Sequence, residues 1–199
     1  NRGFLKLERI DWRTSAIVLE KLIQYEAVHA VQGWRDLRRR LEGDRRCFAF
    51  FHPQLPDEPL IFIEVALTRG MSAQVQPLLD INSQVAAPAQ ADCAIFYSIT
   101  NCQEGLRGTS FGNLLIKQVA EDLKREFPHL RTFATLSPIP GFMRWLGRTE
   151  TRVQLSLGPN AEQRLALLSS IDEPGWHSGE VPEPLQKLLL RLCAWYLLH

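Results

Sequence analysis

The sequence lacks the features that mark a membrane protein or a disulfide-rich secreted protein. None of its apolar runs reaches the ~20 residues that a helix needs to span a bilayer. Its four cysteines, at positions 47, 93, 102 and 193, form no Cys-x-x-Cys pair, which argues against a zinc or thioredoxin-like site. Because three of them lie in apolar segments, we expect buried, reduced thiols and a cytoplasmic protein.

An excess of charge of either sign is also absent. The 23 Lys and Arg residues nearly balance the 22 Asp and Glu residues, and the net charge is +1. We therefore expect neither a nucleic-acid partner nor a membrane partner. What the sequence does have is apolar: 45% of its 199 residues are hydrophobic, which is enough for a packed core. It begins with Asn1-Arg2-Gly3-Phe4, with no signal or transit peptide, so we expect it to start inside a longer protein.

The spacing of apolar residues predicts a chain that alternates between helices and strands. The predicted helices cover residues 7–29, 34–41, 110–127, 142–146, 160–171 and 183–198. The predicted strands cover residues 47–51, 60–67, 94–100 and 131–136, and residues 82–92 are expected to form a surface loop. A strand, a glycine-containing loop, a helix and a further strand behind an antiparallel hairpin are typical of an α/β fold.

Residues 107–112 (Arg-Gly-Thr-Ser-Phe-Gly) lie where a predicted strand ends and the clearest predicted helix begins. A helix start offers unpaired backbone N–H groups and a positive dipole end, and glycine lets the backbone approach an anion closely. These features favour a pyrophosphate site, with an ordinary capped helix as the alternative for this motif alone. The dinucleotide fingerprint Gly-x-Gly-x-x-Gly and the Gly-Lys-Ser/Thr of a P-loop are both absent. The residues expected to bind are Arg107, Gly108, Thr109, Ser110, Phe111, Gly112 and Asn113.

The same segment resembles the acyl-CoA loop of GNAT-type acyltransferases, whose pattern is Arg/Gln-x-x-Gly-x-Gly/Ala. Arg107 and Gly112 occupy the first and last places of that pattern. Ser110 occupies the place of the first glycine, where it can cap the helix but leaves less room for an anion. The resemblance implies that the backbone N–H groups of residues 108–113 meet the phosphates of CoA.

Short runs along nearly the whole chain resemble malonyl-CoA decarboxylases, in the same order. They include Tyr-Glu-Ala-Val-His at 25–29, Leu-Ser-Pro-Ile-Pro-Gly-Phe at 136–142 and Leu-Cys-Ala-Trp-Tyr-Leu at 192–197. The resemblance implies an α/β (α+β) fold of the GNAT acyltransferase type, with a mixed central sheet flanked by helices. It also implies the decarboxylation of malonyl-CoA to acetyl-CoA and carbon dioxide, without a metal or an organic cofactor.

The resemblance further implies how the chain is organised. Residues 1–42 are expected to be the lead-in from a helical domain that supports a homo-oligomer, and residues 43–199 the catalytic domain, incomplete at its C-terminal end. The family's histidine follows the Leu-Cys-Ala-Trp-Tyr-Leu segment at a distance, and the 199 residues contain no such downstream segment. We therefore expect the proton donor to lie beyond this chain, and these residues alone to bind CoA without turnover. The histidines at 29, 52, 129, 177 and 199 are not expected to be catalytic.

Two serines are the candidate catalytic residues that the resemblance supplies. Ser137, in Leu-Ser-Pro-Ile-Pro, corresponds to the family's active-site serine, and its hydroxyl would orient the substrate or stabilise the enolate. The two prolines restrict the backbone around it, which would hold the hydroxyl in place. Ser98, in Phe-Tyr-Ser-Ile, matches a second active-site serine of the family.

The role of an arginine cluster is undecided from the sequence, and two alternative functions of the chain also remain. The mixed signs of residues 35–46 predict a solvated helix face, with contact to CoA phosphates or to a neighbouring subunit as the alternative. The arginines of this cluster are Arg35, Arg38, Arg39, Arg40, Arg45 and Arg46. One alternative function is a GNAT-type transfer of an acyl group from CoA to an amine. The other is a CoA-binding module without catalytic activity.

Overall fold

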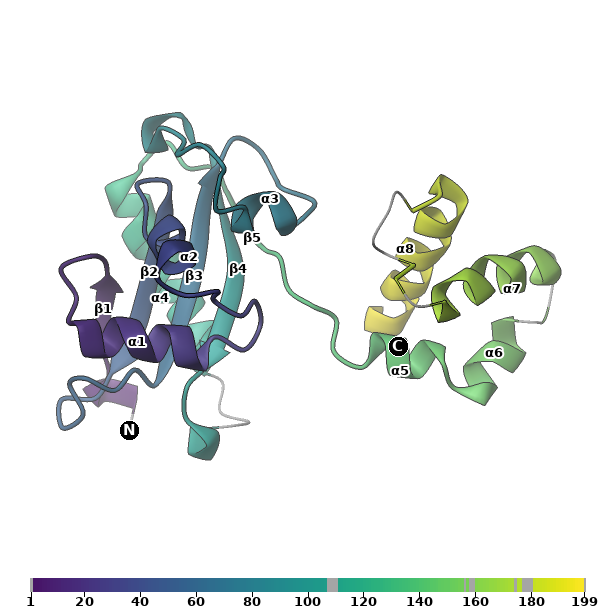
Figure 1. The fold of residues 1–199 in the computed structure, drawn as a ribbon, viewed down its shortest axis with the longest axis horizontal. Coiled ribbons are helices and arrows are strands. Elements are labelled where there is room, and N and C mark those ends of the chain that lie inside the picture. Colours follow the sequence, from purple (N-terminus) through teal and green to yellow (C-terminus); the bar gives the residue numbers. More distant parts are fainter. Residues whose placement is uncertain are drawn as a thin grey trace. The chain divides into compact units, whose positions relative to one another are not determined.

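The computed structural model describes residues 2–106, 111–155, 157, 160–173, 175–176 and 181–198. The chain divides into two compact units, Asn1–Ser137 and Pro138–His199 (Figure 1). The first unit contains a sheet covered by helices, and the second is helical. Residues 1–42 belong to the first unit, and their expected connection to a helical domain stays a prediction.

The first unit is built on a five-stranded mixed sheet. Its strands lie in chain order, the first four antiparallel and the last pair parallel. The parallel pair is joined through a helix, as parallel neighbours require. The expected α+β class, with a mixed sheet flanked by helices, is therefore confirmed. The strands are β1 (Lys6–Ile10), β2 (Arg45–Phe51), β3 (Ile61–Thr68), β4 (Cys93–Asn101) and β5 (Thr132–Thr135).

Helices cover both faces of this sheet, so its central strands are nearly continuous apolar runs. On one face lies α4 (Phe111–Glu126), which buries Leu115, Val119 and Leu123 completely, as its four-residue spacing predicted. On the other face lie α1 (Ala16–Tyr25) and α2 (Trp34–Arg40), together with the short α3 (Gln76–Leu79), which the sequence did not reveal (Figure 1).

The prediction of a single helix over residues 7–29 is wrong in its first part. Residues Lys6–Ile10 form the edge strand β1, which pairs along its whole length with β2. Helix α1 begins only after Ser15, whose hydroxyl accepts a hydrogen bond from the Val18 N–H at 3.5 Å. Pairing with a distant strand therefore decides the structure of residues 6–10, and local periodicity could not reveal it.

The second unit consists of helices packed around a small apolar core. The helices expected near 142–146, 160–171 and 183–198 are confirmed, while the one at 149–155 was not anticipated. Gly141 has φ +78°, and a Cβ there would lie 2.9 Å from the hydroxyl oxygen of Tyr196, so this position requires glycine. The helices are α5 (Phe142–Leu146), α6 (Thr149–Leu155), α7 (Ala161–Ser169) and α8 (Glu183–Leu198).

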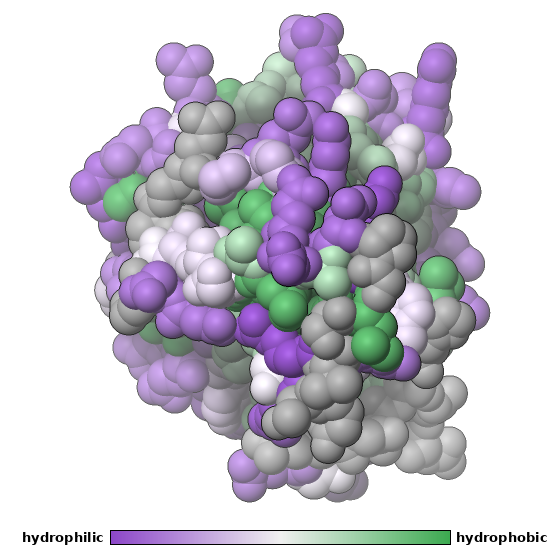
Figure 2. All heavy atoms as spheres, turned by 90° about the vertical axis from the view of Figure 1, so that its right-hand side faces the viewer, coloured by the Kyte–Doolittle hydropathy of each residue, from purple (hydrophilic) through white to green (hydrophobic). Residues whose placement is uncertain are grey.

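The surface combines apolar and polar side chains. Figure 2 shows one face on which hydrophobic atoms reach the surface between hydrophilic ones. In the second unit, Met143, Leu190 and Leu198 are among the exposed large apolar residues. Among the described residues, no helix has the length and hydropathy that crossing a membrane would require.

Candidate active site

Strand β4 extends beyond its parallel neighbour β5. Residues Cys93–Phe96 pair with β5, and the Leu136 N–H donates to the Phe96 carbonyl at 2.9 Å. The rest of β4, Tyr97–Asn101, has no partner in β5. Because α4 follows β4 closely in the chain, the start of α4 and the ends of both parallel strands lie at the same end of the sheet. Ligands of such sheets bind outside the carboxyl ends of the strands.

A β-bulge lies where β4 leaves β5. Glu64 of β3 pairs with Ser98 and Val65 pairs with Phe96, so Tyr97 is an extra residue in β4. Both Tyr97 and the following Ser98 are buried against the connection that follows α1. The Tyr97 ring lies 6.4 Å from the His29 ring between centroids. The bulge therefore turns two consecutive side chains of β4 toward the same helical layer.

The Ser98 hydroxyl belongs to a buried hydrogen-bond cluster centred on Glu26. It donates to the Glu26 carboxylate, with Oγ 2.9 and 2.8 Å from the two carboxylate oxygens. Thr100 Oγ1 donates to the same carboxylate at 3.2 Å, and the backbone N–H groups of Val28 and His29 donate at 2.8 and 2.9 Å. These contacts satisfy a carboxylate that is only 6% exposed, and they tie the end of α1 to β4.

Ser137 lies just past the end of β5, and its side chain is exposed. The last register pair joins Phe96 with Thr135, so Ser98 and Ser137 each follow that pair by two residues. The structure thus places both candidate serines at the same end of the two parallel strands, with different surroundings. Ser98 is 2% exposed and hydrogen-bonded, whereas the Ser137 residue is exposed.

The expected phosphate-binding segment is described only in part. Arg107, Gly108, Thr109 and Ser110 lie outside the described residues, whereas Phe111, Gly112 and Asn113 form the first turn of α4. First-turn N–H groups of a helix point along its axis, beyond its N-terminus. A Cβ on Gly112 would lie 3.7 Å from the Ile99 side chain and 4.0 Å from that of Ile61, which is ordinary contact. Position 112 therefore faces the sheet.

The prediction of a solvated arginine face is correct for only part of the cluster. Arg35 and Arg38 are exposed, but the four others are almost fully buried: Arg39, Arg40, Arg45 and Arg46. The buried arginines were not recognised because their acidic partners include residues far away in the sequence, which a local pattern of mixed charges does not reveal.

Arg40 links helix α2 to the sheet. Its guanidinium donates to both Asp36 oxygens at 2.8 and 3.1 Å and to Glu64 Oε2 of β3 at 3.1 Å. Burial raises the pKa of Glu64 to about 7, although the charge of Arg40 opposes that shift. Burial also raises the pKa of the neighbouring Tyr97 hydroxyl well above its ordinary range. This face of the sheet thus holds a dense cluster of buried titratable groups.

The other buried arginines, Arg39, Arg45 and Arg46, also pair with carboxylates. Arg39 forms a two-pronged pair with Asp44, with N–O distances of 2.7 and 3.0 Å. Burial alone would raise the pKa of Asp44, but the hydrogen bonds from Arg39 and the Ala86 N–H, together with the charges of Arg45 and Arg39, outweigh it and lower that pKa. Arg45 also contacts Asp44, while Arg46 points to the opposite face and pairs with Glu126 of α4 at 2.7 Å.

The remaining histidines and possible metal ligands form no further site in the part of the chain that the structure describes. Within those ranges, no group of three or more His, Cys, Asp or Glu residues is arranged to hold a metal ion. His29 Nε2 is buried and has no hydrogen-bond partner there. His177 and His199 fall outside the described residues.

The mixed sheet with helices on both faces and a crossover helix between its parallel strands defines an α+β domain. The chain belongs to the malonyl-CoA decarboxylase family: the model of the malonyl-CoA decarboxylase C-terminal domain matches residues 3–199. The malonyl-CoA decarboxylase of Rattus norvegicus is 39% identical over 217 residues, covering 98% of this chain and 44% of that protein. The chain thus spans less than half the length of such relatives.

Solved structures of the same family agree with the fold. The malonyl-CoA decarboxylase of Rhodopseudomonas palustris is 49% identical and superposes with a TM-score of 0.86, covering 98% of this chain and 48% of that one. The enzyme of Agrobacterium vitis is 50% identical with a TM-score of 0.82, covering 96% and 46%.

The buried charge cluster predicts a large and position-specific loss of stability. Arg40→Met leaves Asp36 and Glu64 without their cation, and we expect a loss of about 3–5 kcal/mol in the free energy of unfolding. Arg38→Met is the matched control, because Arg38 is 72% exposed and the change should cost less than about 0.5 kcal/mol. Urea unfolding of both variants measures the difference, and equal losses would contradict the role given to Arg40.

The raised pKa of Glu64 predicts a pH dependence with a definite sign. A carboxyl whose pKa is higher in the folded protein favours folding fully below its ordinary value of 4.5, and that contribution disappears as the pH rises to about 7. Glu64→Gln removes the titration. Relative to this variant, the wild-type protein should lose stability steadily between pH 4.5 and 7. Unfolding curves that stay parallel across this range would show that Glu64 does not titrate there.

Proposed function

We propose that this chain is the CoA-binding and catalytic part of an enzyme that converts malonyl-CoA to acetyl-CoA and carbon dioxide. Family membership supports the reaction. The observation that carries the assignment of the site is the position of Ser137. It is an exposed serine at the open edge where β4 runs past β5, at the same end of the sheet as the start of α4.

This arrangement suits the two ends of a CoA thioester. The N-terminus of α4 supplies backbone N–H groups and a positive dipole end for the pyrophosphate, with residues 107–113 as the proposed contacts. The pantetheine arm carries two amides. It can lie against residues 97–101 of β4, whose edge has no β5 partner. The thioester would then reach the neighbourhood of Ser137.

The chemistry requires stabilisation of a negative charge. When the bond between the carboxylate carbon and the α-carbon breaks, carbon dioxide leaves and the electron pair forms the enolate of the thioester. We propose that the Ser137 hydroxyl donates a hydrogen bond to the enolate oxygen or orients the departing carboxylate. A proton must then reach the α-carbon, and the family resemblance assigns its delivery to a histidine beyond residue 199.

Ser98 has a different proposed part. Its single hydroxyl proton is directed to Glu26, so it cannot donate to the substrate at the same time. We propose that Ser98 is a positioning residue that keeps the bulged part of β4 in place beneath the thioester. No cofactor is needed for this chemistry, because the thioester itself accepts the electron pair.

The cellular location, the oligomeric state and the partners of the enzyme are also proposals. The free thiols of all four cysteines are consistent with the reducing cytoplasm. Three of the relatives, from Rattus norvegicus, Anser anser anser and Mus musculus, carry the word mitochondrial in their names. We propose that the full protein forms a homo-oligomer and binds neither nucleic acid nor membrane, in keeping with its near-zero net charge.

Removal of the Ser137 hydroxyl should affect turnover more than binding. For Ser137→Ala in the full protein we expect kcat for malonyl-CoA to fall by about a hundredfold, the effect of losing one donor to a developing charge. The affinity for acetyl-CoA should stay within about twofold. Thr132→Val, which removes an exposed hydroxyl from the start of β5, is the control and should retain full activity. A Ser137→Ala enzyme as fast as the control would refute the assignment.

A charge at the start of α4 should weaken CoA binding without harming the fold. Asn113 is exposed in the first turn, where a carboxylate favours the helix dipole but repels phosphates. Asn113→Glu should weaken CoA binding roughly tenfold, equivalent to about 1.4 kcal/mol, and added salt should reduce the effect. Asn113→Gln is the size-matched control. Calorimetric affinities that are the same for both variants would place the phosphates elsewhere.

Product analysis separates the proposal from its alternatives. Incubation of the full protein with malonyl-CoA alone should release carbon dioxide and acetyl-CoA. An acyltransferase would produce free CoA only when an amine is added, and a binding module would bind acetyl-CoA without turnover.

A further inference from the structure

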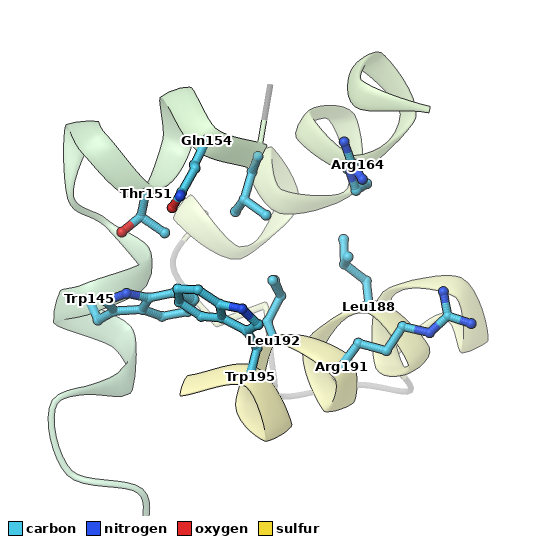
Figure 3. A pocket seen from close by; sticks show the side chains of 9 residues that line it. Trp145, Thr151, Gln154, Arg164, Leu188, Arg191, Leu192 and Trp195 are labelled. Atoms are coloured by element: carbon cyan, nitrogen blue, oxygen red, sulfur yellow. The ribbon is translucent and has the colours of Figure 1, made fainter. Parts of the chain in front are cut away.

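The second unit contains a pocket that the proposed decarboxylation does not use. Its volume is about 380 Å³, and all of its lining comes from α6, α7, α8 and the end of α5 (Figure 3). This size lies within the range of small-molecule sites, which begins near ~300 Å³. The lining residues are Trp145, Thr151, Gln154, Leu155, Arg164, Leu188, Arg191, Leu192 and Trp195.

One end of the pocket is aromatic. The Trp145 and Trp195 rings are stacked, with centroids 5.4 Å apart and planes inclined by 28°. Leu192, which lies about one turn before Trp195 on α8, and Leu188, a further turn back, continue the apolar wall. A flat aromatic ring or a short aliphatic chain would fit between the indoles and the leucine side chains.

The other end of the pocket is cationic. Arg164 of α7 and Arg191 of α8 both line it, away from the indole pair (Figure 3). Arg164 donates through Nη2 to the Leu157 carbonyl at 2.6 Å, but its Nε is buried without a hydrogen-bond partner. Within the described ranges, neither guanidinium is paired with a carboxylate; the ion pairs found in this unit are Arg152–Asp172 and Lys187–Glu183. An unsatisfied, buried guanidinium N–H is costly, and an anion would satisfy it.

We propose that this pocket binds an amphiphilic anion: a small molecule with a flat or aliphatic apolar body and a carboxylate or phosphate group at one end. The apolar body would lie on the indoles, and the anionic group would accept hydrogen bonds from Arg164 and Arg191. This proposal does not depend on the decarboxylation, because every lining residue lies in the second unit, whereas the proposed CoA site lies in the first.

The test is calorimetric titration of the purified full protein with three probes of the same ring system: 2-naphthoate, 2-naphthyl phosphate and the neutral 2-naphthalenemethanol. We expect one saturable site per chain for at least one of the anions, and the tighter anion identifies the preferred head group. The neutral probe should bind at least about tenfold more weakly, because it cannot form charge-assisted hydrogen bonds. Excess acetyl-CoA should leave the binding unchanged.

Variants locate the site. Arg191 is exposed on α8, so the Arg191→Gln variant should fold normally. Its affinity for the anionic probe should be at least about tenfold lower. Arg164→Gln should act in the same direction. Lys187→Gln is the matched control, since it removes one cation from the same helix outside the pocket and should leave binding unchanged. The proposal is overturned if neither anion binds at millimolar concentration, if the neutral probe binds equally well, if Arg191→Gln behaves like the control, or if acetyl-CoA displaces the probe.

Discussion

The Arg40 guanidinium joins the helical layer to the sheet, and the geometry of the candidate site depends on that union. Its bond to Glu64 links α2 to β3 directly beside the bulge of β4, while Asp36 of the same helix holds the guanidinium in place. The Glu26 cluster extends the same polar layer to Ser98 and Thr100. A buried ion cluster adds little net stability over an apolar core, but we propose that this one allows only a single arrangement of its members. It would thereby fix where the end of β4 lies.

The opposite face of the sheet is covered by α4, mainly through apolar contacts. Helix α4 packs there through Leu115, Val119 and Leu123, and Arg46 anchors its last turn through Glu126. Helices cover both faces of the sheet. Among the described residues, the edge of β4 near the bulge stays open because β5 ends before it. A CoA thioester placed along that edge has the start of α4 at one end and Ser137 at the other. The fold would thus set the distance between the phosphate-binding site at the start of α4 and the thioester near Ser137.

Much of this could be predicted from the sequence, because much of it is local. The spacing of apolar residues in α4 and the continuous runs of β2 and β3 depend on neighbours within a few residues. What could not be predicted depends on distant partners. Arg40 meets Glu64 across 24 residues and Arg46 meets Glu126 across 80, so their mixed charges looked like a solvated surface. Likewise, β1 is a strand only because β2 pairs with it. The partner of the Ser98 proton, Glu26, is 72 residues away.

A crystal structure of the full protein with bound acetyl-CoA tests the account most directly. The account predicts that the pyrophosphate accepts hydrogen bonds from backbone N–H groups at the start of α4, within about 3.2 Å. It predicts that the pantetheine arm lies along residues 97–101 of β4 and that the thioester oxygen lies within reach of the Ser137 hydroxyl. A CoA molecule bound away from the start of α4, or with its thioester remote from Ser137, would contradict it.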